Sequence, residues 1–305
     1  MTQVLGQTHT TTVEKIPGPG GLEILVRSWQ PGGKARGIVA ICHGVNSHSG
    51  YYTWVAERLV STGLAVYALD LHGRGRSDGE RFYLDKISDY VHDVHAVVTL
   101  AKSRDMGVPV FLLGHSAGGV VSCVYTLEHQ ADLAGLICES FAFQVAAPDF
   151  ALAVVKGLSH LAPHAHVLRL KNEEFSRDPQ VVQAMNRDPL IADEVQPTKT
   201  VAELVRADER LKREFPLITL PVLILHGTAD KVTNPKGSQL FYDTAGSTDK
   251  TLKLYEGHVH DLLNDVDKEV VMTDITGWID ARLPAVRPGS TSRDAGAATS
   301  AVAQL

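Results

Sequence analysis

The chain has 305 residues, of which 44% are hydrophobic and 21% are charged, and its formal net charge at pH 7 is −6. These proportions are typical of a globular protein and exclude a low-complexity or strongly charged disordered chain. Because the net charge is negative and no basic stripe is present, the composition argues against nucleic acid and anionic membrane surfaces as partners.

The cysteines and the first residues predict a cytoplasmic protein. Cys42, Cys123 and Cys138 form an odd set without paired spacing, and each lies in or beside an apolar run. Such residues are typical of buried thiols in a reducing compartment. The amino terminus lacks the basic and apolar regions of a signal peptide, and no apolar run approaches the roughly 18 residues of a membrane span. We therefore expect no integral membrane association.

The predicted elements begin with two β-like runs, 11–16 and 22–29, which a Pro- and Gly-rich segment joins into an antiparallel hairpin. Continuous apolar runs follow at 37–42, 64–69, 108–113, 133–138 and 221–225, with a further strand at 252–255. Strands that are apolar on both faces are typical of a parallel sheet covered by helices. Helix-compatible stretches separate or follow them at 52–62, 87–104, 118–129, 235–245 and 266–283. This alternation predicts a mostly parallel, doubly wound α/β sheet, which binds ligands beyond the carboxyl ends of its strands.

One connection is much longer than the others. Roughly 75 residues, 141–216, lie between the run 133–138 and the run 221–225, and a structureless loop of that length is improbable in a compact domain. The stretches 146–161 and 200–213 within it are compatible with helices. We interpret 141–216 as a helical cap inserted after the sixth strand. The core then comprises 1–140 and 217–286, and 287–305 form a disordered tail.

The residues Gly114-His-Ser-Ala-Gly118 lie between a predicted strand and a predicted helix. A Gly-x-Ser-x-Gly motif in this context places its serine on a sharp turn with an exposed hydroxyl. Ser116 is therefore the candidate nucleophile. The oxyanion donors that such a serine requires are expected from the backbone amide of Ala117 and from that of Val45, which follows the strand 37–42.

A serine hydroxyl needs a base, and the base needs an acid that orients it. Asp230 follows the strand 221–225 and is the candidate acid, while Glu139 after the strand 133–138 is a rival with a more plausible structural role. Two histidines, His258 and His260, compete as the base. We favour His260 because it opens a helical turn. The chain order Ser, Asp, His is one that such enzymes use.

An apolar stretch at the start of the cap suggests a hydrophobic acyl or aryl group beneath it, although about half of these residues could instead pack onto the core. The stretch contains Phe141, Phe143, Phe150, Leu152, Val154, Val155 and Leu158. Around the motifs, the residues expected to contact the substrate are His43, Gly44, Tyr51, His115, Phe141 and Phe143.

No cofactor and no metal ion are expected. A proline interrupts the histidines of 160–166, and His92 and His95, which lie among aspartates, are more typical of a solvated helix face. The glycine-rich segment 73–79 lacks the Gly-Lys-Ser/Thr ending of a phosphate loop, so we expect a structural turn there.

Together these motifs resemble the α/β-hydrolase superfamily, and within it the monoacylglycerol lipase and lysophospholipase-like branch. The resemblance covers about residues 22–283 and depends on motifs at 43–52, 70–81, 114–119, 226–230 and 255–264. It implies the α/β-hydrolase fold, with Ser116 as nucleophile, Asp230 as acid and His260 as base. It also implies oxyanion donors at Val45 and Ala117.

The chain departs from the branch at three places. Where the branch has Gly-Glu-His-Ser-Gly-Arg-Tyr, this chain has Asn46-Ser-His-Ser-Gly-Tyr-Tyr52. Ala117 stands where methionine is commoner and leaves more room beside the nucleophile, and Glu139 is atypical after its strand.

We therefore predict a serine hydrolase that cleaves carboxylic esters with a hydrophobic acyl group through an acyl-enzyme, with monoacylglycerol-type lipids as the nearest substrates. The alternative is a short-chain or aryl esterase, or an amide or carbamate hydrolase, that uses the same triad. A cofactor-free haloperoxidase-like or carbon–carbon bond hydrolase and a non-catalytic binding protein are the remaining alternatives.

Overall fold

The computed structural model describes residues 9–143 and 149–284, so the tail predicted at 287–305 lies outside the described residues. An eight-stranded sheet forms its centre, in the order β1-β2-β4-β3-β5-β6-β9-β10. The strands are β1 (Thr10–Pro17), β2 (Glu23–Gln30), β3 (Ile38–Cys42), β4 (Ala65–Leu69), β5 (Val110–His115), β6 (Gly135–Glu139), β9 (Val222–Gly227) and β10 (Lys250–Tyr255). Strands β1 and β2 form the predicted hairpin, and β2 pairs antiparallel with β4. The other neighbours are parallel, so the predicted sheet type is confirmed.

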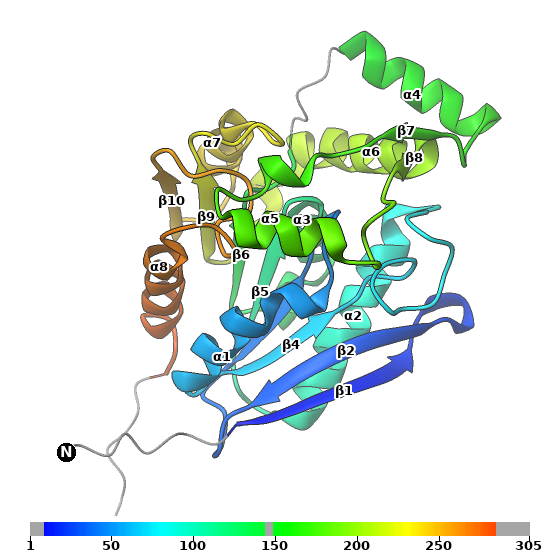
Figure 1. The fold of residues 1–305 in the computed structure, drawn as a ribbon. Helices are drawn as coiled ribbons and strands as arrows, with labels where there is room; N and C mark the ends of the chain where they lie inside the picture. Colours follow the sequence, from blue (N-terminus) through cyan, green and yellow to red (C-terminus); the bar gives the residue numbers. More distant parts are fainter. Residues whose placement is uncertain (1–8, 144–148, 285–305) are drawn as a thin grey trace, which may run out of the picture.

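Helices cover both faces of this sheet (Figure 1). Alternate residues of β3 explain why: Val39 and Ile41 belong to one apolar cluster, whereas Ile38 and Ala40 belong to another. The first cluster lies under α1 (Thr53–Ser61) and α8 (Lys268–Asp280). The second lies under α2 (Ile87–Arg104), α3 (Ala117–His129) and α7 (Pro235–Thr244). A strand buried on both faces needs apolar residues at every position, which is the pattern that predicted it.

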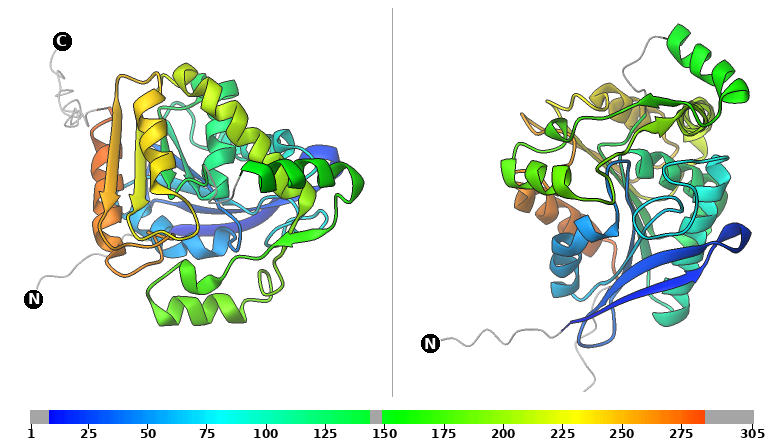
Figure 2. Two further views of the ribbon diagram at one scale, coloured as in Figure 1. Left: turned by 90° about the horizontal axis from the view of Figure 1, so that it is seen from above. Right: turned by 45° about the vertical axis from the view of Figure 1, so that its right-hand side comes forward.

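The connection between β6 and β9 crosses one end of the sheet, as seen from above in Figure 2. Its elements are α4 (Asp149–Leu161), β7 (His166–Leu168), α5 (Pro179–Arg187), β8 (Gln196–Pro197) and α6 (Thr198–Glu214). Helix α4 packs on α6, and α6 packs on α3 of the core. The sequence predicted α4 and α6, but it did not predict α5 or the small β7–β8 sheet.

A buried arginine ties this connection to the core. Arg74 lies in the segment 73–79, where Gly73 and Gly79 have φ angles of 70° and 114°, so the segment is the turn that we expected. The Arg74 side chain is 2% exposed and pairs with Glu194. It also donates to the hydroxyl of Tyr90 (2.9 Å) and to Oε1 of Gln196 at the start of β8 (2.7 Å). One side chain therefore joins α2 of the core to residues 194–196.

The variant Arg74→Met should lower the free energy of unfolding by about 3–5 kcal/mol, because it leaves the buried Glu194 carboxylate without its partner. Urea denaturation of the wild type and the variant measures this difference. Arg104→Met is the matched control, since the Arg104–Glu14 pair has exposed fractions of 40% and 28% and should cost less than about 1 kcal/mol. Equal losses in the two variants would contradict the anchoring role.

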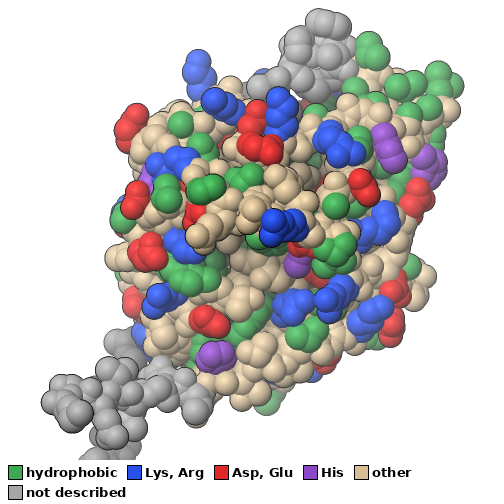
Figure 3. Space-filling model, viewed as in Figure 1, with side chains coloured by type: hydrophobic (Ala, Val, Ile, Leu, Met, Phe, Trp, Pro, Cys, Tyr) green, Lys and Arg blue, Asp and Glu red, His purple; other side chains and the backbone are tan. Residues whose placement is uncertain are grey.

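The surface in Figure 3 carries lysine, arginine, aspartate and glutamate side chains interspersed on the same face. None of the helices in the described ranges combines the length and the hydropathy that crossing a bilayer requires.

Candidate active site

Ser116 lies on the turn between β5 and α3, and it is 2% exposed. Its φ and ψ angles are 53° and −123°, which a residue with a side chain adopts only when its surroundings hold it there. Two glycines make room for this turn. A Cβ on Gly118 would lie 2.3 Å from the carbonyl oxygen of Cys42. A Cβ on Gly44 would lie 2.8 Å from Cβ of Ser116 and 3.0 Å from the carbonyl oxygen of His115. Both positions therefore require glycine because the backbones approach closely.

His260 joins Ser116 to Asp230, although the three residues are far apart in the sequence. Its Nε2 lies 2.9 Å from Oγ of Ser116, and its Nδ1 lies 2.8 Å from Oδ2 of Asp230. Because a carboxylate only accepts hydrogen bonds, the imidazole donates from Nδ1 and leaves Nε2 free to accept from the serine hydroxyl. Each residue follows the carboxyl end of a parallel strand: β5 for Ser116, β9 for Asp230 and β10 for His260. This geometry can activate a serine for nucleophilic attack.

The Asp230 carboxylate has further partners that the sequence did not predict. Its Oδ2 also accepts from Nε2 of His226 (3.0 Å) and from Oγ1 of Thr233 (2.7 Å). Its Oδ1 accepts from the backbone amides of Val232 (2.7 Å) and Thr233 (3.0 Å). Burial alone would raise the pKa of Asp230, but His260, His226 and the Thr233 amide outweigh it and hold the pKa well below its ordinary value. The carboxylate is therefore ionised at any pH at which the protein would be assayed.

The two rival residues lie elsewhere. The His258 ring contacts Tyr255, with ring centroids 5.5 Å apart, and no hydrogen bond joins it to Ser116 among the described residues. Glu139 is fully buried, and its Oε1 accepts from the backbone amide of Leu262 (2.7 Å). Asp230, rather than Glu139, is therefore the carboxylate that meets the imidazole.

The expected oxyanion donors border the same space as the serine. Val45, in the loop after β3, and Ala117 both line the cavity into which Ser116 opens. Because α3 begins at Ala117, the amide of this residue has no acceptor within the helix. The amide of Ala117 is thus available beside the nucleophile, and Val45 borders the same space as the second expected donor.

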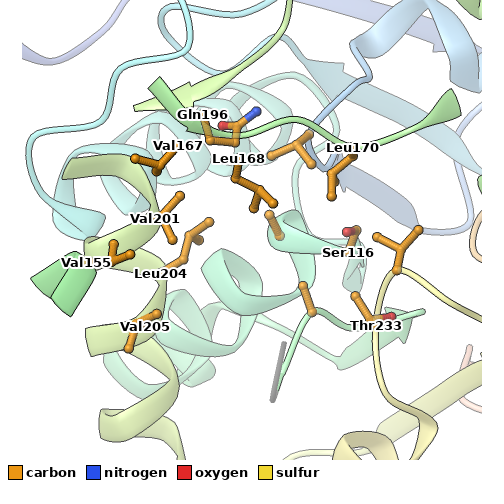
Figure 4. Close-up of a pocket in the computed structure, with 14 residues that line it drawn as sticks. Ser116, Val155, Val167, Leu168, Leu170, Gln196, Val201, Leu204, Val205 and Thr233 are labelled. Atoms are coloured by element: carbon orange, nitrogen blue, oxygen red, sulfur yellow. The ribbon is translucent and has the colours of Figure 1, made fainter. Parts of the chain in front are cut away.

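This cavity has a volume of about 190 Å³ and an almost wholly apolar wall. Figure 4 shows Ser116 and Thr233 at one side of it and Val155 of α4 at the other. Between them, α6 contributes Val201, Leu204 and Val205, and the segment 167–170 contributes Val167, Leu168 and Leu170. An apolar space that starts at a nucleophile suits a hydrocarbon group of a substrate.

The six residues that we expected to contact the substrate are absent from the described lining of this cavity, and the structure explains their other roles. His43 is buried, its Nδ1 lies 2.6 Å from the carbonyl oxygen of Gly44, and its Nε2 accepts from the amide of Leu71 (3.0 Å). Burial lowers the pKa of His43 to about 4, so this neutral ring braces the loop that carries Val45. Gly44 packs against Ser116 itself.

The described residues that line the cavity also do not include Tyr51, His115, Phe141 or Phe143. The Tyr51 hydroxyl donates to Asp188 (3.0 Å), and His115 is buried beneath His260 with ring centroids 5.0 Å apart. Phe141 and Phe143 belong to the core, where their rings stack 5.5 Å apart and contact further phenylalanines of the same cluster. Apolar character alone did not distinguish core residues from cavity residues.

The rest of the apolar stretch divides between cavity and surface. Val155 lines the cavity, whereas Val154 is 63% exposed. The side chains of Phe150 and Leu152 lie outside the described part of the structure.

Two groups of described side chains have ligand atoms close enough together to hold a metal ion: His95, His129 and Asp132, and His115, Glu139 and Asp261. The first group lies between α2 and the end of α3, and the second lies beneath the triad.

We expected His92 and His95 to lie with their neighbouring aspartates on a solvated face of α2. This prediction is wrong for one of the aspartates, because Asp93 is fully buried and accepts from the backbone amide of His72 (3.0 Å).

Comparison with known proteins identifies relatives over most of the chain. Residues 33–267 match the family described as serine aminopeptidase, S33. The monoacylglycerol lipase of Mycolicibacterium smegmatis is 33% identical over 278 residues, which cover 90% of this chain and 99% of that protein. The human monoglyceride lipase is 33% identical over 267 residues, which cover 86% of this chain and 88% of that protein. Among solved structures, the monoacylglycerol lipase of Paleococcus ferrophilus has a TM-score of 0.75 at 27% identity, covering 90% of this chain and 99% of that one.

Proposed function

We propose that this α/β-hydrolase, which belongs to the serine aminopeptidase S33 family, cleaves monoacylglycerols as a serine ester hydrolase. The observation that carries the proposal is the hydrogen-bonded series from Ser116 through His260 to Asp230, which opens into an apolar cavity. The lipases among its relatives support the substrate class.

In the first half of the reaction, Oγ of Ser116 attacks the ester carbonyl carbon while its proton passes to Nε2 of His260. The amides of Val45 and Ala117 donate to the oxyanion of the tetrahedral intermediate, and each such donor is worth about 2.7–4 kcal/mol. His260 then protonates the leaving glycerol oxygen, and the carbon–oxygen bond breaks to leave an acyl-serine.

In the second half, water replaces the alcohol. His260 takes a proton from the water, the resulting hydroxide attacks the acyl-serine, and the imidazolium returns its proton to Oγ of Ser116 as the fatty acid leaves. Asp230 keeps its charge throughout and stabilises the imidazolium in both halves. Each residue thereby returns to its starting state.

The acyl chain occupies the apolar cavity, with its carboxyl end at Ser116 and its methyl end toward Val155. Burying a methylene group is worth about 0.8 kcal/mol, so an apolar wall favours a hydrocarbon over a polar acyl group. Such a wall excludes water from the acyl chain, while the water that His260 activates needs to reach only the carbonyl carbon at Ser116.

The variant Val155→Trp should shorten the range of acyl chains that the enzyme accepts, because an indole at this position occupies the far part of the cavity. We expect kcat/KM for a long-chain monoacylglycerol to fall about tenfold or more, with little change for a butyryl ester. A panel of monoacylglycerols with C4 to C18 chains measures the effect. Val154→Trp is the matched control, since Val154 is exposed and does not line the cavity; equal losses in both variants would contradict this placement of the chain.

The substrate class is tested by comparing initial rates on monoacylglycerols, aryl esters and β-diketones at equal concentration. The proposal expects monoacylglycerols to give the highest kcat/KM. A preference for aryl esters would support the short-chain or aryl esterase, and a preference for diketones would support a carbon–carbon bond hydrolase. Either result would overturn the proposed substrate.

A further inference from the structure

Glu139, the last residue of β6, contacts both halves of the candidate active site. Its backbone carbonyl accepts from the amide of Ser116 (3.0 Å), and its side-chain Oε1 accepts from the amide of Leu262 (2.7 Å). Leu262 lies two residues beyond His260. Glu139 therefore holds the serine turn through its backbone and the histidine loop through its side chain, and it is fully buried while doing so.

The charge state of Glu139 follows from its surroundings. The second oxygen, Oε2, has no hydrogen-bond partner among the described residues and lies 3.9 Å from Nε2 of His115. The Asp261 carboxylate is also near, since the ligand atoms of His115, Glu139 and Asp261 lie within 4.8 Å of one another. Two buried carboxyl groups at such a distance cannot both ionise without a large cost in free energy.

The surroundings favour a proton on Glu139 over one on Asp261. Both oxygens of Asp261 accept from Nδ2 of Asn264 (3.2 and 3.0 Å), which stabilises a negative charge there. Burial raises the pKa of Glu139 and the Asp261 charge raises it further, and together they outweigh the amides of Leu262 and Leu263, which lower it. The other titratable groups around Glu139 are His115 of β5, Asp230 after β9, His260 after β10, Tyr255 at the end of β10, and Tyr52 beside α1. None of them is a lysine or arginine that could balance a second carboxylate.

We propose that Glu139 is a positioning residue that works as a neutral carboxylic acid, fixing the His260 loop to the serine turn without placing another negative charge beneath the imidazole. The inference rests on the proposed function, because it concerns the same reaction. An ionised Glu139 would favour the imidazolium form of His260, and a protonated imidazole cannot accept the serine proton. A neutral side chain at position 139 adds no charge that would favour the imidazolium form.

The variants Glu139→Gln and Glu139→Leu separate the charge of the side chain from its hydrogen bond with the amide of Leu262. Glutamine keeps a neutral side chain and the oxygen that accepts from Leu262, so kcat/KM should stay within about threefold and the acid limb of its pH profile should not move. Leucine leaves the Leu262 amide without its acceptor. Because a displacement of 1 Å can cost about 100-fold in rate, we expect kcat to fall by about that factor while KM changes little.

The pH profile makes the test independent of whether the leucine variant folds. If Glu139 is ionised in the wild type, glutamine removes a negative charge, and the acid limb should move about one unit or more toward lower pH. That shift would overturn the proposal, as would a leucine variant with the wild-type kcat. A stoichiometric metal ion bound at His115, Glu139 and Asp261 in the purified protein would also overturn it.

Asp93→Leu is the matched control, because it removes another fully buried carboxylate that lies on α2 and holds His72. It should lower stability without changing kcat per folded molecule. The rate of labelling by a fluorophosphonate is measured for each variant alongside ester hydrolysis. A wild type that labels rapidly but does not cleave monoacylglycerols would refute the proposed substrate and leave the role of Glu139 to be judged from the labelling rates.

Discussion

Ser116→Ala is expected to lower kcat for ester hydrolysis by about 10⁶-fold, the loss seen when a triad nucleophile is removed. Without Oγ there is no atom to form the acyl-enzyme, and His260 has no hydroxyl from which to accept a proton. The change is small and leaves the turn between β5 and α3 intact, so substrate should still bind. Steady-state kinetics on a monoacylglycerol, with binding of a non-cleavable ether analogue, measure the two effects separately.

Ser122→Ala provides the matched control for this variant. Ser122 is a buried serine of the same helix α3, and it does not line the cavity. Its replacement should leave kcat within about threefold of the wild type, as for a small change away from the reacting atoms. A Ser116→Ala protein that kept its activity would exclude the acyl-enzyme mechanism.

Asp230→Asn should lower kcat by about 10⁴-fold, because the amide turns an NH₂ group toward His260 and favours the wrong tautomer of the imidazole. The fold should persist, since asparagine is nearly the same size as aspartate. If Glu139 could supply the acid instead, Asp230→Asn would lose little activity and Glu139→Gln would lose most of it. Kinetics of the two variants under identical conditions therefore distinguish the two carboxylates.

The same variant has a consequence for stability against pH. The pKa of Asp230 is lower in the folded protein than in the unfolded chain, so its ionised form stabilises the fold. That contribution is complete above the unfolded pKa and disappears as the pH falls through the folded one. Chemical denaturation at pH 7 and in strong acid should accordingly show Asp230→Asn less stable than the wild type at pH 7, with the difference shrinking in acid.

The central sheet could be predicted because its strands are buried on both faces. Residues 38–42 of β3 and 110–113 of β5 alternate between two apolar clusters, so each of these runs is apolar throughout and stands out in the sequence. Helix α2 was predicted with its observed bounds, since Tyr90, Val94, Val97 and Ala101 recur at helical spacing on its buried side. Local patterns were sufficient where one element packs against a uniform apolar layer.

The connection between β6 and β9 was predicted only in part, because its shorter elements depend on distant contacts. Strand β8 is two residues long, and the buried Arg74 holds its first residue. Helix α5 begins at Pro179, directly after Asp178, whose side chain accepts from the amide of Gln180. The helix contributes one buried residue, Met185. An amphipathic pattern with so small a buried side gives a weak sequence signal.

At the candidate site, the sequence predicted the residues that meet at the imidazole but not those that support them. His226 is four residues before Asp230 in the same motif, so its presence near the strand end was visible. The sequence did not show that the His226 ring contacts the Asp230 carboxylate, because this contact depends on the conformation of the turn between the two residues. Thr233 contacts His260, 27 positions away, and Glu139 accepts from the amide of Leu262, 123 positions away. No local pattern reveals such contacts.

Labelling with a fluorophosphonate, followed by intact mass measurement and peptide mapping, tests the activated serine most directly. We predict one phosphonyl group per chain, attached to the peptide that contains residues 114–118 and located on Ser116. Hydrolytic activity should fall in proportion to the labelled fraction. An enzyme that stays unlabelled while it cleaves esters, or that carries the label on another residue, would contradict the meeting of hydroxyl, imidazole and carboxylate as the source of its activity.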